Sequence, residues 1–154
     1  MKRVIKTLNE MSFDLPEGWQ VTSDQYKLSN GQGFINRENY LSKTGKVISL
    51  FELHRDPEEF FEYYQKLVEN YNKVTDMYEL EKQFTLKIGE FDFPVYIIKG
   101  FRQKLIYVLQ AFVNCGDRLG CFIINIDKVS ENPKDMIKQN EVFAELVKIL
   151  RTVE

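Results

Sequence analysis

The residues best suited to chemistry in this chain are few and lie far apart in the sequence. There is one histidine, His54, which precedes Arg55 and Asp56. A Ser–His–Asp or Cys–His catalytic device would have to include this histidine, yet no serine lies in the G-x-S-x-G context of a hydrolase nucleophile. His54 is expected at a strand–helix junction, where a surface or cap-adjacent role is the ordinary one. The sequence therefore predicts no catalytic residues.

The two cysteines, Cys115 and Cys121, flank the segment GDRLG. Two are too few for a disulfide framework or a structural zinc site. A zinc site that added His54 would need three distant segments to converge, without the local spacing such sites show. We expect no metal and no cofactor. A disulfide across the hairpin and a pair of small apolar side chains at strand ends both remain open.

The carboxylates and glycines also occupy ordinary positions. Glu79 and Glu81 share the parity of a solvated strand face, and Asp127 ends an apolar run where a turn is expected. No carboxylate lies inside an apolar run that would raise its pKa. The segments NGQGF and KTGKVISL lack the spacing of a phosphate-binding loop. These patterns point to no acid–base pair and no nucleotide site.

Composition limits the partners. The 154 residues are 44% hydrophobic and 29% charged, which suits one globular domain over 1–154, with 1–10 as a candidate loose N-terminal segment. The net charge is −2, with 21 basic and 23 acidic residues well mixed, so we expect no nucleic-acid partner. No segment approaches the ~20 apolar residues of a membrane span. We expect a cytoplasmic protein without membrane insertion.

The first half of the chain predicts strands and then a helix. A strand over 11–15 leads into a turn at 16–18 and a short second strand, because Phe13 and Leu15 alternate with polar residues and Pro16 favours extended geometry before it. Short strands are expected around 26–28 and 33–37, and a better one over 46–53. A helix should start at Pro57, capped by Asp56. Its expected apolar stripe is Phe60, Tyr64, Leu67 and Tyr71.

The second half predicts a four-strand meander and a closing helix. In the first of these strands one parity is apolar, with four residues expected on one face: Leu80, Phe84, Leu86 and Ile88. The hairpin over 105–126 is apolar on both faces, which places it at the centre of a sheet covered on two sides. One helix is expected from Pro133 to about 153. The fold class is therefore α+β, an antiparallel sheet of about six to seven strands sandwiched by two main helices.

The segment Phe13-x-Leu15-Pro16-x-Gly18-Trp19 resembles the opening motif of the PsbP-like/Mog/DcrB group. The strand IYVLQAFVN, the CGDRLG turn, the strand CFIINI and the closing amphipathic helix resemble that group's second half. The resemblance spans residues 11–150, although 22–45 have no clear counterpart. It implies an αβα sandwich around an antiparallel sheet.

The same resemblance implies several kinds of function. Members of the group bind a nuclear transport GTPase, sit on a photosystem or serve as bacterial lipoproteins, and this chain lacks a lipobox cysteine. The cytoplasmic bacterial members nearest in length and layout resemble Eag-type chaperones of type VI secretion, dimers that hold hydrophobic helices of effector proteins. A non-catalytic chaperone or adaptor is the first hypothesis. A ligand-binding protein or enzyme with a pocket near His54, Asp56 and Arg102, and an immunity-type protein, are the alternatives.

Gln110 is the unusual residue, since it interrupts the apolar run LIYVLQAFV. It can be a hydrogen-bonded glutamine at a sheet edge or under a helix end, or a polar contact on a face that receives a partner. Eag-type chaperones are thought to grip a helix with strand glutamines, which implies the second role. We name Tyr107, Gln110 and Phe112 as candidate partner-binding residues. The expected partner is a protein with a helical or hydrophobic segment, and a homodimer is a further expectation.

Overall fold

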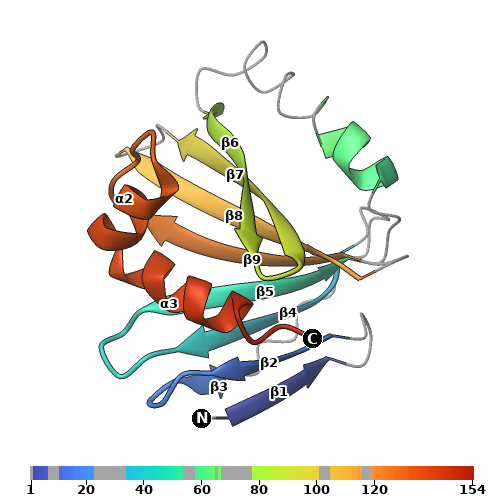
Figure 1. Cartoon of the computed structure of the whole chain (residues 1–154), viewed down its shortest axis with the longest axis vertical. Helices are drawn as coiled ribbons and strands as arrows, with labels where there is room; N and C mark the ends of the chain where they lie inside the picture. The colour runs from blue at the N-terminus through green and yellow to red at the C-terminus, as the bar shows by residue number, and fades with distance from the viewer. Residues whose placement is uncertain are drawn as a thin grey trace.

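Seven antiparallel strands form one sheet in the computed structural model, which describes residues 2–6, 11–22, 34–53, 58–64, 66, 78–100, 105–115 and 119–154. The strand order is β3-β4-β5-β9-β8-β7-β6 (Figure 1). The bounds are β3 (Gln20–Thr22), β4 (Phe34–Leu41), β5 (Val47–Leu53), β6 (Tyr78–Ile88), β7 (Phe91–Gly100), β8 (Ile106–Asn114) and β9 (Leu119–Ile126). The α+β class with an antiparallel sheet is confirmed. The strand expected around 26–28 lies outside the described residues.

The β8–β9 hairpin lies at the centre of the sheet, between β5 and β7, as its apolar composition predicted. Side chains on both of its faces are buried. Leu109 and Phe122 contribute to the larger core cluster, while Phe112 and Cys121 belong to a second cluster on the opposite face. Both faces are covered over Ala111–Val113 and Leu119–Phe122, which is why the sequence lacks polar alternation there.

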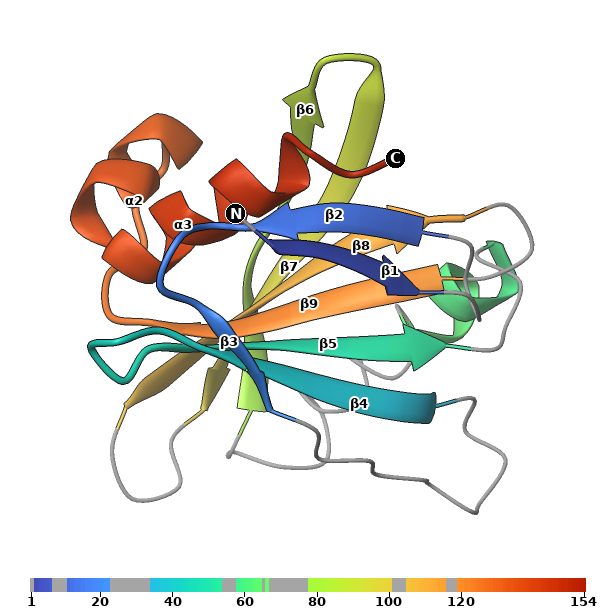
Figure 2. The ribbon, with the colours of Figure 1, turned by 90° about the horizontal axis from the view of Figure 1, so that it is seen from below.

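The first face of the sheet is covered by a two-stranded hairpin as well as by helices. Strand β1 (Lys2–Lys6) pairs antiparallel with β2 (Met11–Leu15), so part of the segment expected to be loose is a strand (Figure 2). Val4 is buried, and the Phe13 ring meets the rings of Tyr40 and Phe122 edge-on, with centroids 5.6 and 5.3 Å apart. Burial of apolar area therefore holds the hairpin on the sheet.

The opening motif moves the chain from this hairpin to the edge of the large sheet. The Trp19 N–H donates to the Pro16 carbonyl oxygen over 3.2 Å, and Gly18 has φ +90°, a conformation that favours glycine. Directly after the turn, β3 pairs with β4. Trp19 is 8% exposed and belongs to the larger core cluster. Pro16, Gly18 and Trp19 thus have a structural role that accounts for the motif.

The closing segment forms two helices, so the prediction of one continuous helix was wrong. Helix α2 (Pro133–Gln139) and helix α3 (Glu141–Leu150) are separated by Asn140, whose backbone is extended at φ −126° and ψ 105°. The Asn140 side chain is 4% exposed and bonds to the loop before α2. An asparagine that bonds to nearby backbone groups competes with helical geometry, which explains the break.

A second correction concerns Leu80, which was expected on the same face as Phe84, Leu86 and Ile88. The β6–β7 register shifts between Leu80 and Lys82, so the strand contains a β-bulge. A bulge inserts one residue and reverses the facing of the side chains on its two sides. Leu80 accordingly packs with the second cluster, whereas Phe84, Leu86 and Ile88 pack against the larger core.

Residues 58–64 form a helical segment on the second face, the face opposite α2, α3 and the β1–β2 hairpin. Phe60 and Tyr64 are buried there, as their spacing predicted. The predicted start at Pro57, its cap Asp56, and the stripe residues Leu67 and Tyr71 lie outside the described residues.

Candidate functional site

The second face of the sheet carries three rows of side chains that run across the strands. Directly paired residues define each row, because side chains of paired residues stand side by side on one face. The apolar row comprises Leu41, Val47, Val108, Ile98 and Leu80. The amide row comprises Asn39, Ser49, Ile123, Gln110, Tyr96 and Gln83. The third row includes Arg37, Phe51, Cys121 and Phe112.

The helical segment 58–64 covers the third row. Phe112 is 1% exposed, with the rings of Phe60, Phe61 and Tyr64 at centroid distances of 5.5, 5.2 and 5.8 Å. The Tyr64 ring also meets Tyr96 edge-on at 5.0 Å. Edge-to-face and tilted arrangements are those that aromatic quadrupoles prefer. This part of the second face is therefore an aromatic core rather than a free surface.

The amide row is a line of hydrogen bonds at the margin of that core. The Tyr64 hydroxyl donates to Oε1 of Gln110. Gln83 Nε2 donates to the Tyr96 hydroxyl over 3.2 Å, and Ser49 Oγ donates to Asn39 Oδ1 over 2.6 Å. Burial raises the pKa of Tyr96 above its ordinary value.

The described residues cover the apolar row less completely than they cover the third row. Leu41 is 37% exposed and Val47, its cross-strand partner, is 46% exposed. Val108, Ile98 and Leu80 are half-buried. The row runs from β4 to β6 with one polar member, the exposed Asn125 opposite Val108. Beyond it, Leu105 and Ile106 are 53% and 36% exposed at the start of β8.

The three predicted partner-binding residues do not share a face. Gln110 and Phe112 lie on the second face, whereas Tyr107 packs against the larger core on the first. Alternation along a strand separates odd from even positions, so the sequence already carried the signal that Tyr107 points the other way. Phe112 is buried beneath the helical segment, and Gln110 bonds to Tyr64. Only Gln110 borders the exposed part of the face.

Sequence reasoning missed the apolar row because its members come from five strands. Leu41 and Val47 flank the turn 42–46, in a region where turn signals dominated the prediction. Leu80 reaches the row through the bulge. Cross-strand register decides which residues become neighbours, and a single sequence does not display it.

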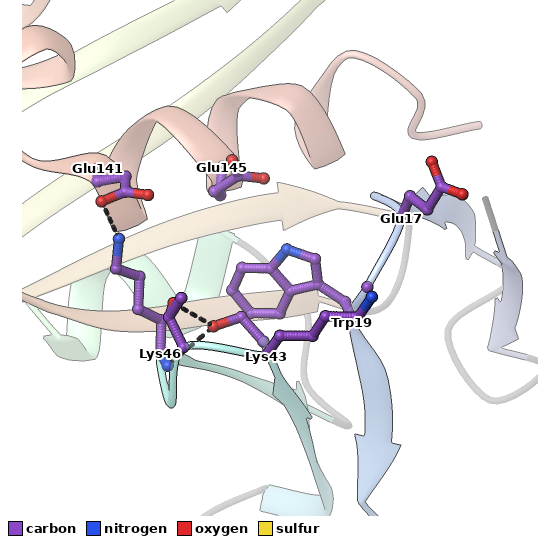
Figure 3. Close-up of a pocket in the computed structure, with 9 residues that line it drawn as sticks. Glu17, Trp19, Lys43, Lys46, Glu141 and Glu145 are labelled. Carbon is purple, nitrogen blue, oxygen red and sulfur yellow. Dashed lines mark hydrogen bonds and ion pairs between the residues drawn. The ribbon is translucent and has the colours of Figure 1, made fainter.

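A small cleft lies on the first-face side, between the β4–β5 turn and helix α3 (Figure 3). Its volume is about 160 Å³, and Trp19 forms part of its lining together with Glu17, Lys43 and Glu145. Lys46 Nζ makes an ion pair with Glu141 across it. Ligand pockets usually measure ~300–1,000 Å³. The lining has lysines and glutamates but no nucleophile beside a base, so it assembles no recognisable catalytic set.

The other candidate chemical residues form no site in the described part of the chain. Cys115 and Cys121 form no disulfide, and burial raises the pKa of the Cys121 thiol, which makes it unreactive. Glu79 pairs with Lys99 at 3.6 Å. Among the described residues no three His, Cys, Asp or Glu side chains are grouped as metal ligands. His54, Asp56 and Arg102 lie outside the described residues.

A larger cleft, about 510 Å³, lies where the β5–β9 pairing ends. The β5–β9 ladder ends at Ser49–Ile123, and Val47, Asn125 and Asn140 line the space beyond it. The cleft adjoins the apolar row at Val47.

No helix in the described residues is long and apolar enough to cross a membrane.

Comparison with solved structures places the fold. No protein-family model matches the chain, and no curated protein matches its sequence. The cyanobacterial PsbP (CyanoP) of Synechocystis sp. PCC 6803 is similar at a TM-score of 0.58, with 10% identity over 99% of this chain and 91% of that one. A mutant of the protein Mog1 has a TM-score of 0.54, with 13% identity over 99% of this chain and 94% of its own.

A protein from Bacteroides thetaiotaomicron also has a TM-score of 0.54, at 14% identity. The match covers 99% of this chain but only 47% of that protein. At identities this low the likeness shows the fold alone. It confirms the PsbP/Mog-like fold that the opening motif indicated, and the Eag-type relationship stays a prediction.

Proposed function

We propose that this chain is a non-catalytic protein-binding module that holds an apolar helical segment of another protein against the second face of its sheet. The observation that supports this most is the apolar row, in which Leu41 and Val47 are more than a third exposed beside a third row that aromatic rings cover. Large apolar side chains that are partly exposed together on one face are typical of a surface that receives a partner.

The length of the row suits one helix. Between β4 and β6 there are five strand spacings, which at about 4.8 Å each give a strip of about 24 Å. A helix that follows this strip would have about 16 residues. The amide row runs alongside and adds polar atoms of Gln110, Asn39 and Gln83 that can orient backbone or hydroxyl groups of the partner.

The proposal has a specific form and alternatives. In the specific form the chain is an Eag-type chaperone or adaptor in the cytoplasm, and the segment it holds belongs to a secreted effector. A ligand carrier, an enzyme of unknown chemistry or an immunity-type protein would use a different surface. The described clefts offer these alternatives no grouped reactive side chains.

The test is co-purification from the source organism with matched variants. Val47→Asp and Val108→Asp each place a charge in the apolar row. Phe91→Asp is the control, because Phe91 is 48% exposed and shares the parity of Phe93, which belongs to the larger core on the first face. We expect partners retained by the parent protein and by the control to be lost from both row variants. Partners that bind all three variants equally would contradict the proposal.

A further inference from the structure

The outer edge of β6 is the longest strand edge of the sheet that has no described strand paired with it. Near its start, the Lys82 ammonium donates to the carbonyl oxygens of Ser130 and Glu131 in the loop before α2. Strand β6 spans eleven residues and ends the strand order on one side, while the other edge strand, β3, has three. An unpaired edge of this length is a template for another strand, and proteins usually block such edges with bulges, charges or proline. The bulge at Leu80–Lys82 interrupts the first part of β6. From Lys82 to Ile88 the pairing with β7 is regular.

Backbone hydrogen-bonding groups on this regular part point outward at every second residue. The two-residue loop Gly89–Glu90 closes on the pair Ile88–Phe91, so hydrogen-bonded pairs with β7 recur at Ile88, Leu86 and Phe84. Pro94, which has no N–H, lies opposite Thr85, as that alternation requires. The N–H and C=O groups of Gln83, Thr85 and Lys87 therefore face away from the sheet.

We propose that β6 pairs antiparallel with β6 of a second copy of this chain, centred on Thr85, which joins two seven-stranded sheets into one. This register superposes the regular segment 82–88 on itself. It sets Phe84 opposite Leu86 of the second copy on the first-face side, and Gln83 opposite Lys87 on the other. Aromatic–aliphatic pairs of this kind stabilise sheets.

Charge and burial agree with a second copy as the occupant. No like charges lie opposite each other in this register, and Glu81 comes diagonally near Lys87 of the second copy. Phe84, Leu86 and Ile88 are half-buried at present, so the edge offers partly exposed apolar side chains that a symmetric copy would cover. The inference does not depend on the proposed function, because it uses the outward backbone groups of residues 83–87, whereas the apolar row uses side chains and has only Leu80 on β6.

Thr85→Pro tests the edge directly. Proline removes the outward N–H of residue 85 and leaves the hydrogen-bonded pairs with β7 intact, which edge strands tolerate. Because residue 85 pairs with itself across the two-fold axis, both central N–H donors are lost. We expect the dimer dissociation constant measured by sedimentation velocity to rise at least about 30-fold. Thr85→Ala, which keeps the N–H, is the matched control and should remain a dimer.

A charge variant keeps the test decisive if Thr85→Pro does not fold, which far-UV circular dichroism would reveal. Lys87→Glu brings a like charge near Glu81 of the second copy and should weaken the dimer, and Glu81→Lys added to it should restore it. A parent protein that stays monomeric up to high micromolar concentration would overturn the proposal. A dimer unaffected by the proline and by the charge reversal would overturn it equally, since it would place the interface elsewhere.

Discussion

Asn140 should be one of the most sensitive polar positions in the protein. Its Oδ1 accepts the N–H groups of Asp127 and Lys128 over 2.9 and 3.1 Å. Its Nδ2 donates to the carbonyl oxygens of Lys128 and Met136 over 2.8 and 3.0 Å. The side chain is 4% exposed and uses all of its principal bonding positions. It joins the end of β9 to the junction of the two helices.

The expected cost of Asn140→Ala follows from these four bonds. At about 1 kcal/mol each, they set an upper value of about 4 kcal/mol in the free energy of unfolding. Asp127 and Lys128 are exposed, so their backbone groups can turn to water and recover part of this. Alanine also favours a continuous helix by a few tenths of a kcal/mol. We therefore expect a loss of about 3 kcal/mol, or about 6–12 °C in Tm for a domain of this size.

Urea unfolding followed by Trp19 fluorescence measures this loss, because the only tryptophan lies beside α3. Asn132→Ala is the matched control. Asn132 caps α2 through one side-chain bond, from the Lys134 N–H over 2.9 Å, and is exposed. Its removal should cost about 1 kcal/mol. If Asn140→Ala costs no more than Asn132→Ala, the hydrogen-bonding account of the helix break is wrong.

Two further predictions concern titration and access to the second face. Burial raises the pKa of Tyr40 far above its ordinary value, and the Tyr40 hydroxyl donates to Glu38. As the pH rises, the unfolded chain loses the Tyr40 proton before the folded protein does. The free energy of unfolding should therefore fall above about pH 10 by up to about 1.4 kcal/mol per pH unit. Tyr40→Phe should reduce that slope in alkaline urea titrations, and an unchanged slope would count against the assignment. Phe60→Ala should destabilise the packing of the helical segment 58–64 over Cys121 by about 3 kcal/mol. The rate of thiol labelling at Cys121 should then rise up to about 100-fold. Labelling of Cys115 in the same protein is the internal reference, and equal acceleration of both thiols would indicate general unfolding instead.

The hydrophobic pattern predicted the central layers well because it depends on local parity. The structure confirms the strand predicted from the alternation at Phe13 and Leu15, whose side chains are buried. It also confirms the central position predicted for the hairpin at 105–126. The break at Asn140 and the bulge before Lys82 were missed. The break at Asn140 depends on its bonds to Asp127 and Lys128, and the bulge is a register shift between β6 and β7. Local periodicity shows neither.

The candidate site was harder to predict than the fold. Gln110 was singled out as unusual, and the structure gives it a hydrogen bond to Tyr64 beside the apolar row. Its role in partner binding stays a prediction. Tyr107 was grouped with Gln110 although it lies at the opposite parity. The row itself joins Leu41 to Leu80 through strand pairings that no local window contains. Its discovery needed the sheet order.

Photo-crosslinking from the apolar row tests the central proposal most directly. A benzophenone amino acid at Val47, on the exposed second face, would be activated in cells of the source organism, with the same group at Phe91 as the control. We predict crosslinks from position 47 to an apolar helical stretch of about 16 residues in one partner, absent from position 91. Crosslinks of equal yield from both positions, or none from position 47 while the partner remains bound, would contradict the account.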